Sequence, residues 1–337
     1  MIETITRDRL LHLLGRLRDV RVVVVGDAML DVYLHGDVDR ISPEAPVPVV
    51  RVRERRVAPG GAANVAQNVL AIGARCDMVC TVGDDAAGTE LRHLLGTAGV
   101  DGLVSASRPT TTKTRVLARA QQLVRVDEED DAELPAEELP RLIESATAAI
   151  EHADALVLED YNKGVLAPTV IRATIDAARI RGIPVVVDPK YRNFFEYHGA
   201  TIFKPNRREL ESALGAAVDL DHPTALPATL GRLRVDHLLL TLGERGMALI
   251  SHDGEIGHIP TTAREVYDVV GAGDTVTAYL ATALAAGATA AEAAVVANFA
   301  AGVEVGKLGA ATVGINEVVN AFDAYRTSKS RAGTSAP

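Results

Sequence analysis

Residues 268–275 read DVVGAGDT and lead into a segment of helical composition that contains TAYLATALAAG (277–287). The pattern predicts a glycine-rich turn at a helix N-terminus, where unpaired N–H groups and the helix dipole favour an anion. Gly271 and Gly273 let the backbone approach an oxyanion closely. The charge of Asp274 would repel a phosphate, so this carboxylate is better suited to take a proton from a hydroxyl that attacks the phosphate. A simple helix cap is the alternative role for Asp274.

The composition narrows the class of protein. The chain has 337 residues, 47% of them hydrophobic, and a formal net charge of −10. This charge disfavours nucleic acid and anionic membranes as partners and indicates small-molecule chemistry. No apolar run approaches the roughly 20 residues of a membrane helix, and the N-terminus reads as an amphipathic helix, not as a signal peptide. The only cysteines, Cys76 and Cys80, fit buried core thiols better than a zinc site, so we expect a cytoplasmic protein.

Apolar β-branched runs alternate with alanine- and leucine-rich segments of helical period, which predicts βαβ units and a mainly parallel sheet. Open α/β sheets bind ligands beyond the carboxyl ends of their strands. Five of the predicted strands end in polar groups, although each end alone would pass for an ordinary loop. These groups are Asp27, Asp160 with Lys163, Asp188 with Lys190, Asn206 with Glu209, and Thr241 with Gly243. Together they predict one long ligand groove.

Residues 37–57 and 109–126 interrupt the alternation. They alternate polar and apolar side chains, with a turn expected near residues 120–122, and predict a small basic sheet that projects as a lid. A solvated strand face is the better explanation for most of its arginines. The other predicted regions are a main domain of residues 1–36, 58–108 and 127–328 and a flexible tail of residues 329–337.

A second glycine pair, Gly60 and Gly61, precedes a predicted helix that begins NVAQNVLAIG. Close backbone approach at these glycines, together with the amide of Asn64, suits a polyhydroxylated ligand. Asp27 can accept hydrogen bonds from adjacent hydroxyls. Ordinary turn residues are the alternative interpretation of these positions.

Three segments resemble signatures of the ribokinase/PfkB carbohydrate kinase family: PGGAANVAQN, KPNRRE and DVVGAGDT. The resemblance covers nearly the whole chain and implies an α/β fold, namely a ribokinase-like three-layer α/β/α sandwich with a mainly parallel central sheet and a small β-sheet lid. Within the family, DAMLDVYLHGDVDRISPEAPVPVV, RVLARAQQLVRVD and GVEVGKLG resemble the D-glycero-β-D-manno-heptose 7-phosphate kinases. That implies ATP-dependent phosphorylation of the anomeric C1 hydroxyl to the 1,7-bisphosphate, in ADP-heptose and lipopolysaccharide core biosynthesis. Some of these relatives carry a fused nucleotidyltransferase domain, which this chain is expected to lack.

The resemblance also implies roles for residues at matching positions. Asp274 would be the general base, with the N–H groups of Gly271, Ala272 and Gly273 on the γ-phosphoryl. The implied sugar contacts are Asp27, Gly60, Gly61 and Asn64. The implied contacts to ATP and Mg²⁺ are Asn206, Glu209, Thr241, Gly243, Gly246 and Asn298, with Glu209 acting on the metal through water. A buried helix asparagine is the alternative role for Asn298. Asp268 and residues 306–309 would form a loop for a monovalent cation such as K⁺. Many relatives have threonine where Val270 stands, which leaves only backbone contacts there.

The far phosphate of such a sugar requires a cation. Lys163, Lys190, Arg115 and Arg119 are the candidates. The lid would exclude water, and pairing of two lids predicts a homodimer. A kinase for another sugar or a nucleoside is the nearest alternative, and a nucleotide-binding regulatory protein without turnover is the alternative of another class. A dehydrogenase is disfavoured because no G-x-G-x-x-G turn follows the first strand.

Overall fold

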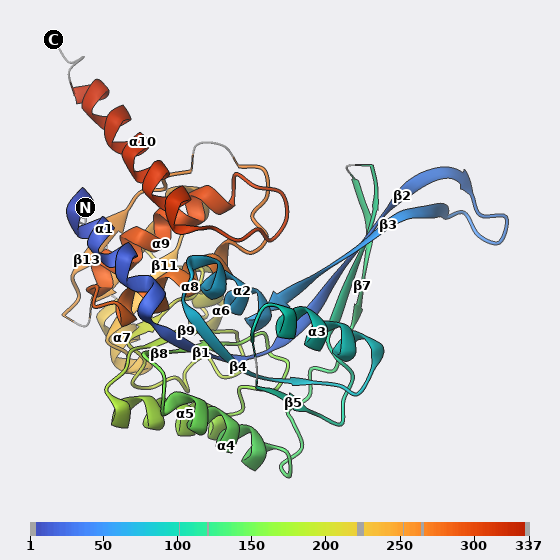
Figure 1. Cartoon of the computed structure of the whole chain (residues 1–337), viewed down its shortest axis with the longest axis horizontal. Helices are drawn as coiled ribbons and strands as arrows, with labels where there is room; N and C mark the ends of the chain where they lie inside the picture. The colour runs from blue at the N-terminus through green and yellow to red at the C-terminus, as the bar shows by residue number, and fades with distance from the viewer. Residues whose placement is uncertain are drawn as a thin grey trace.

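The computed structural model describes residues 5–100, 102–119, 121–220, 226–251, 253–263 and 266–333. Within these residues, nine strands form a central sheet in the order β13-β12-β11-β10-β9-β8-β1-β4-β5 (Figure 1). Each pair of neighbouring strands between β11 and β5 in this order is parallel. The pairs β11–β12 and β12–β13 are antiparallel, so the predicted mainly parallel sheet is confirmed. The strands are β1 (Arg21–Gly26), β4 (Arg75–Val82), β5 (Leu103–Ser105), β8 (Ala155–Glu159), β9 (Val185–Asp188), β10 (Ile202–Phe203), β11 (His237–Thr241), β12 (Met247–Ser251) and β13 (Ile256–Ile259).

Strand β1 shows why the sheet lies in the middle of three layers. Its sequence RVVVVG has no polar face: Val22 and Val24 pack into one hydrophobic cluster, and Val23 and Val25 into another. Because successive side chains of a strand point to opposite faces, helices must cover both sides. The first cluster takes side chains from α1 (Arg7–Arg16), α2 (Ala62–Ile72), α3 (Ala86–Thr97), α8 (Ala272–Ala285), α9 (Ala290–Glu304) and α10 (Ile315–Gly333). The second takes them from α4 (Leu139–Ile150), α5 (Pro168–Arg181), α6 (Arg207–Leu214) and α7 (Leu226–Leu233).

A second sheet of four strands projects from the body (Figure 1). Its strands, in the order β3-β2-β6-β7, are β2 (Ala28–Ile41), β3 (Pro48–Gly61), β6 (Thr112–Ala118) and β7 (Gln121–Glu128). We call this sheet the lid. It begins at Ala28, well before the predicted residue 37, because β2 follows β1 with only Asp27 between them and pairs with β3 as far as Gly61.

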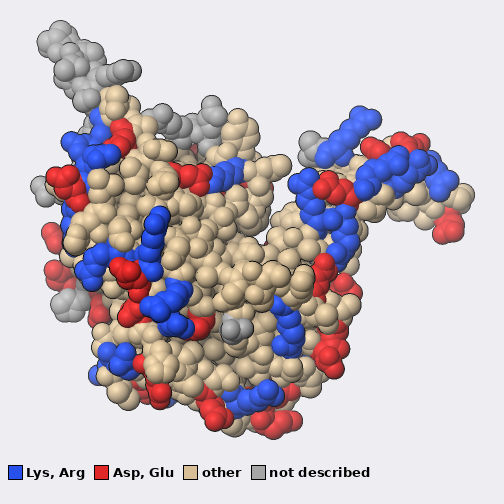
Figure 2. All heavy atoms as spheres, in the orientation of Figure 1, with Lys and Arg blue, Asp and Glu red and all other residues tan. Residues whose placement is uncertain are grey.

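The basic side chains of the lid lie beside acidic ones (Figure 2). Arg53 pairs with Asp37 at 3.1 Å and Arg56 with Glu54 at 2.5 Å, with all four side chains at least 44% exposed. This agrees with the interpretation of most lid arginines as a solvated strand face.

Three smaller expectations concern cysteines, membrane segments and the C-terminus. Cys76 and Cys80 are buried, free thiols of β4, as predicted. No described helix is both long and apolar enough to cross a bilayer. Helix α10 continues to Gly333, so the first five residues of the predicted tail are helical, and residues 334–337 lie outside the described part.

Candidate active site

Asp274 lies in the first turn of α8 and is only 5% exposed. Its carboxylate accepts hydrogen bonds from Asn64 Nδ2 at 2.6 Å and from the Tyr161 hydroxyl at 2.9 Å. Burial, with the charge of Asp188, raises the pKa of Asp274 to about 6, and the two hydrogen bonds oppose the rise. A held carboxylate with a pKa near the working range can act as a general base.

The predicted glycine-rich turn is present directly before Asp274. Gly271 is the N-cap of α8 and has φ of 93°, a left-handed conformation that glycine adopts without strain. The Ala272 N–H bonds to Val269 O at 3.4 Å, whereas no hydrogen bond within the described residues uses the N–H groups of Gly271 and Gly273. These N–H groups of the helix N-terminus are therefore available to an anion.

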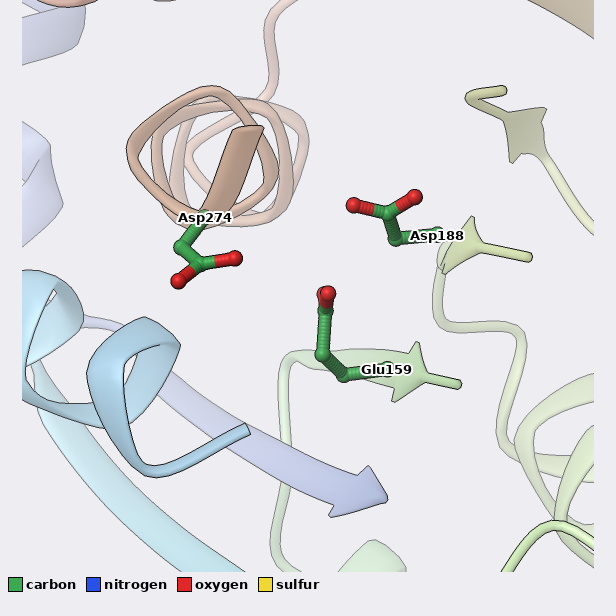
Figure 3. Close-up of side chains that lie close together, drawn as sticks. All are labelled: Glu159, Asp188 and Asp274. Atoms are coloured by element: carbon green, nitrogen blue, oxygen red, sulfur yellow. The ribbon is translucent and has the colours of Figure 1, made fainter. Parts of the chain in front are cut away.

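Two further acids converge on Asp274 (Figure 3). Glu159 at the end of β8 and Asp188 at the end of β9 place carboxylate oxygens within 4.8 Å of those of Asp274. Lys204 Nζ pairs with Asp188 Oδ2 at 2.7 Å and holds the pKa of Asp188 below its ordinary value against burial. Glu159 is fully buried, and burial together with Asp188 and Asp274 raises its pKa well above the ordinary value.

The sequence did not single out Glu159 or Lys204 as site residues. Two features of the sequence could have pointed to them. The run ALVLED ends in two acids, of which only the second was considered, and the KPNRRE motif begins with a lysine. Asp188 was noted only as a strand end.

Asp27 has a structural role that the sequence did not suggest. It is 1% exposed and accepts the N–H groups of Tyr161 at 2.8 Å, Lys163 at 2.9 Å and Val165 at 3.1 Å, so it fixes the loop after β8. It also lines a small pocket beside Lys163, and a carboxylate has about four acceptor sites, so its contact with sugar hydroxyls stays a prediction.

The glycines before α2 are required by close packing. A Cβ on Gly60 would lie 2.4 Å from Asp31 Oδ2, and one on Gly61, where φ is 59°, would lie 2.5 Å from Asp27 O. Asn64 is 2% exposed and donates to Asp274, so it orients the proposed base. Asp31, which the sequence analysis missed, lies next to Gly60 and pairs with Arg115 at 2.5 Å.

Asn206 and Glu209 form the capping box of α6. The Glu209 N–H donates to Asn206 Oδ1 at 2.9 Å, and the Asn206 N–H donates to Glu209 Oε2 at 2.7 Å. Glu209 Oε1 pairs with Lys190 Nζ at 2.8 Å, so Lys190 belongs to this end of the site. Because both Glu209 oxygens accept hydrogen bonds within the fold, a Mg²⁺ ion would reach Glu209 through water, and the carboxylates of Glu159 and Asp188 are oxygen donors of the kind that Mg²⁺ prefers.

The predicted nucleotide residues lie on neighbouring elements. Thr241, at the end of β11, bridges to Asn206, and Gly243 follows with φ of 61°. Gly246 has φ of 83°, and a Cβ there would lie 2.1 Å from Ile259 O. Asn298 is 4% exposed and donates to Pro260 O at 2.9 Å, so its amide is used within the fold.

Asp268 connects the loop before α8 with the loop between α9 and α10 through hydrogen bonds. Its carboxylate accepts the Val270 N–H and the Gly309 N–H, both at 3.1 Å. Glu304 is buried at the end of α9, and among the described residues neither of its carboxylate oxygens has a hydrogen-bond partner. Burial, with the charges of Asp268 and Asp274, raises the pKa of Glu304 to about 8. An orphaned carboxylate beside Asp268 fits a bound cation.

No two of the four cations predicted for the far phosphate share a carboxylate partner among the described residues. Lys190 pairs with Glu209, Lys163 pairs with Glu129 at 2.8 Å, and Arg115 pairs with Asp31. Arg119 is exposed at the outer end of the β6–β7 hairpin, beside residue 120, which lies outside the described residues. The fold thus does not bring Arg119 to the site within one chain.

A three-layer fold with a lid, a buried carboxylate and a glycine turn at one helix N-terminus defines a class of sugar kinase. The chain belongs to the pfkB family of carbohydrate kinases, whose model matches residues 19–317. It is 47% identical over 309 residues to the bifunctional protein HldE of Rhodospirillum rubrum, covering 90% of this chain and 62% of that protein. It is 48% identical over 313 residues to HldE of Gluconacetobacter diazotrophicus, covering 90% and 65%. The chain therefore spans less than two thirds of these curated relatives.

Solved structures share the fold. Ribokinase of Thermotoga maritima matches with a TM-score of 0.70 and 23% identity over 90% of this chain and 99% of that one. Phosphofructokinase-2 of Escherichia coli, in complex with potassium, matches with a TM-score of 0.76 and 20% identity over 90% and 98%. These matches confirm the ribokinase-like fold that the motifs implied.

Proposed function

We propose that this protein transfers the γ-phosphoryl group of ATP to the anomeric C1 hydroxyl of D-glycero-β-D-manno-heptose 7-phosphate. The observation that carries the proposal is the buried Asp274 carboxylate at the N-terminus of α8, next to unused N–H groups. Family membership supports ATP as the donor. The heptose rests on the subfamily resemblance of RISPEAPVPV and QQLVRVD and on the identity to HldE proteins.

Different residues of this chain would have different roles in such a transfer. Asp274 accepts the hydroxyl proton, and Asn64 and Tyr161 hold its carboxylate in place. The N–H groups of Gly271 and Gly273 face the charge that spreads over the phosphoryl oxygens, which is the main demand of phosphoryl transfer. Mg²⁺, held through Glu209 and water, would neutralise phosphate charge.

Two other assignments complete the proposal. Asp268 and Glu304 would hold a monovalent cation behind the glycine turn. Two copies would pair through their lids, since Ile41, Val47 and Val124 of the lid are 62%, 51% and 49% exposed. Sedimentation of the wild type and of a variant with charged residues at these positions would test the pairing.

The direct test measures ADP release with Mg-ATP and a panel of mannose, fructose 6-phosphate and heptose 7-phosphate. We expect turnover with the heptose phosphate and a loss of about 10²- to 10⁴-fold in Asp274→Asn, with ATP binding retained. Turnover confined to an unphosphorylated sugar would discard the heptose assignment. Binding of ATP without turnover of any sugar would favour a regulatory protein.

A further inference from the structure

We propose that Asn68 is a positioning residue of the phosphoryl transfer, because it holds the Asn64 amide in the orientation that donates to Asp274. The inference rests on the proposed function, in which Asp274 is the base. Asn68 belongs to α2 and is fully buried. The sequence analysis considered Asn64 as a site residue and did not consider Asn68.

A series of side-chain hydrogen bonds joins α8 to α2. Thr275 Oγ1 donates to Asn68 Oδ1 at 3.2 Å. Asn68 Nδ2 donates to the backbone O of Asn64 at 3.0 Å and to Asn64 Oδ1 at 3.4 Å. Asn64 Nδ2 then donates to Asp274 Oδ2 at 2.6 Å. Because Thr275 follows Asp274 directly in the chain, these hydrogen bonds form a closed ring, and we call it the amide ring.

Helix geometry brings the four side chains together. Asn64 and Asn68 are four residues apart, so they lie on one face of α2. This helix packs against α8, where Asp274 and Thr275 lie in the first turns. All four side chains are 5% exposed or less. A buried polar group costs free energy unless it is hydrogen-bonded, so each member of the amide ring depends on its neighbours.

The donors and acceptors of the amide ring allow one arrangement of the two amides. The ionised carboxylate of Asp274 only accepts hydrogen bonds, so Asn64 must turn its NH₂ group towards it. Asn68 faces two oxygens of Asn64 and must therefore turn its own NH₂ group towards them. Its Oδ1 is left to accept the Thr275 hydroxyl. If either amide were reversed, an oxygen would face an oxygen.

Thr275 differs from two other buried threonines of α8. The hydroxyls of Thr277 and Thr282 donate to carbonyl oxygens four residues earlier in the same helix, at 3.1 Å and 2.8 Å. This is the usual way in which a threonine inside a helix uses its hydroxyl. The Thr275 hydroxyl instead donates to Asn68, and so it fixes the orientation of the Asn68 amide.

The orientation of the Asn64 amide matters for two parts of the site. Tyr161 donates to Asp274 Oδ1 and Asn64 donates to Asp274 Oδ2, so a rotated Asn64 amide would leave the carboxylate held on one side. A Cβ on Gly271 would lie 3.1 Å from Asn64 Nδ2, so this amide also packs against the glycine turn. Through Asn64, Asn68 therefore acts on the base and on the turn that offers N–H groups to the phosphoryl group.

The test is a double-mutant cycle of Asn68→Leu and Asn64→Ala. Leucine branches at the same carbon as asparagine but lacks its polar groups. We expect Asn68→Leu to lower kcat about tenfold, the size of one lost hydrogen bond, and to leave the KM for ATP within about twofold. In the Asn64→Ala background the same substitution should change kcat by less than about twofold, because two residues that act through one another are not additive.

The threonines of α8 supply a rescue and a matched control. Thr275→Val should lower kcat about threefold, because the Asn68 amide loses the donor that orients it, and Thr275→Ser should restore kcat because it keeps the hydroxyl. Thr282→Val removes a buried hydroxyl of the same helix outside the amide ring, so its kcat should stay within about twofold of the wild type.

A merely structural role for Asn68 predicts a different result. The loss of kcat would then be the same with and without Asn64→Ala, or no larger than the unfolded fraction at the assay temperature, and either result would overturn the inference. If Asn68→Leu does not fold, the threonine variants decide the matter. A loss of kcat in Thr275→Val alone supports the amide ring, and equal kcat in Thr275→Val, Thr275→Ser and Thr282→Val refutes it.

The cycle separates this inference from the proposed function. It can use any sugar that the wild type phosphorylates, so a different sugar substrate discards the heptose assignment and leaves this test intact. Turnover by the wild type with an unchanged kcat in Asn68→Leu refutes only this inference. Near-normal turnover in Asp274→Asn, or no turnover of any sugar by the wild type, refutes the proposed function and this inference with it.

Discussion

The raised pKa of Asp274 makes the pH dependence of turnover a sharp test of its role. Burial favours the neutral acid, so the base form exists only above this pKa. With a pKa of about 6, about a tenth of Asp274 is ionised at pH 5 and nearly all of it at pH 8. If Asp274 is the base, kcat should fall about tenfold over this range. If the pKa of Asp274 had its ordinary value of 3.8, about nine tenths or more of this carboxyl would remain ionised at pH 5, and kcat would barely change.

The variant Tyr161→Phe supplies the internal control. The Tyr161 hydroxyl donates to Asp274 at 2.9 Å and lowers the pKa of that carboxyl, so its removal should move the acid limb to higher pH by about one unit. ADP is measured directly by chromatography at saturating Mg-ATP and sugar phosphate. The substrate phosphates titrate identically with both enzymes, so a displacement between the two profiles belongs to Asp274.

Two outcomes would refute this reasoning. One is a wild-type kcat that stays flat down to pH 5. The other is an acid limb that is unchanged, or moves to lower pH, in Tyr161→Phe.

Three further perturbations test other parts of the structure. Asp27→Ala should destabilise the protein by about 3 kcal/mol or more, because three buried loop N–H groups lose their acceptor; a melting temperature within error of the wild type would contradict this. Arg9→Ala should lower the free energy of unfolding at pH 7. Arg9 lowers the pKa of Glu292 to about 2, so this stabilisation is present above the ordinary carboxyl pKa and is lost as pH falls towards 2; denaturant unfolding that shows the same cost at pH 7 and pH 2.5 would argue against the pair. Added KCl, compared with choline chloride, should raise the melting temperature of the wild type, and Glu304→Gln should weaken that response; an equal response in both proteins would remove Glu304 from the cation site.

Local sequence determined the frame of the site. The run RVVVVG can only be a strand buried on both faces, and its polar continuation at Asp27 lies at a ligand-binding edge because all parallel strands end there. The glycine turn before Asp274 is equally local, since the φ of 93° at Gly271 and the helix after it depend on neighbouring residues. Asn206 and Glu209 also have the spacing of a capping box, which is a local signal. The family resemblance assigned both residues to ATP and Mg²⁺, and the cap was not predicted.

Tertiary structure decided which polar groups meet and which charges stay unpaired. Glu159, Asp188 and Asp274 come from β8, β9 and α8, and nothing in their spacing along the chain predicts that their oxygens lie within 4.8 Å. The same holds for Asp27, whose three donors come from a loop about 135 residues later and give it a structural role that its place in the sequence does not predict. The physical reason is that pKa values and hydrogen bonds depend on distance and burial in space, whereas sequence patterns report only the local backbone and the side of each element that is buried.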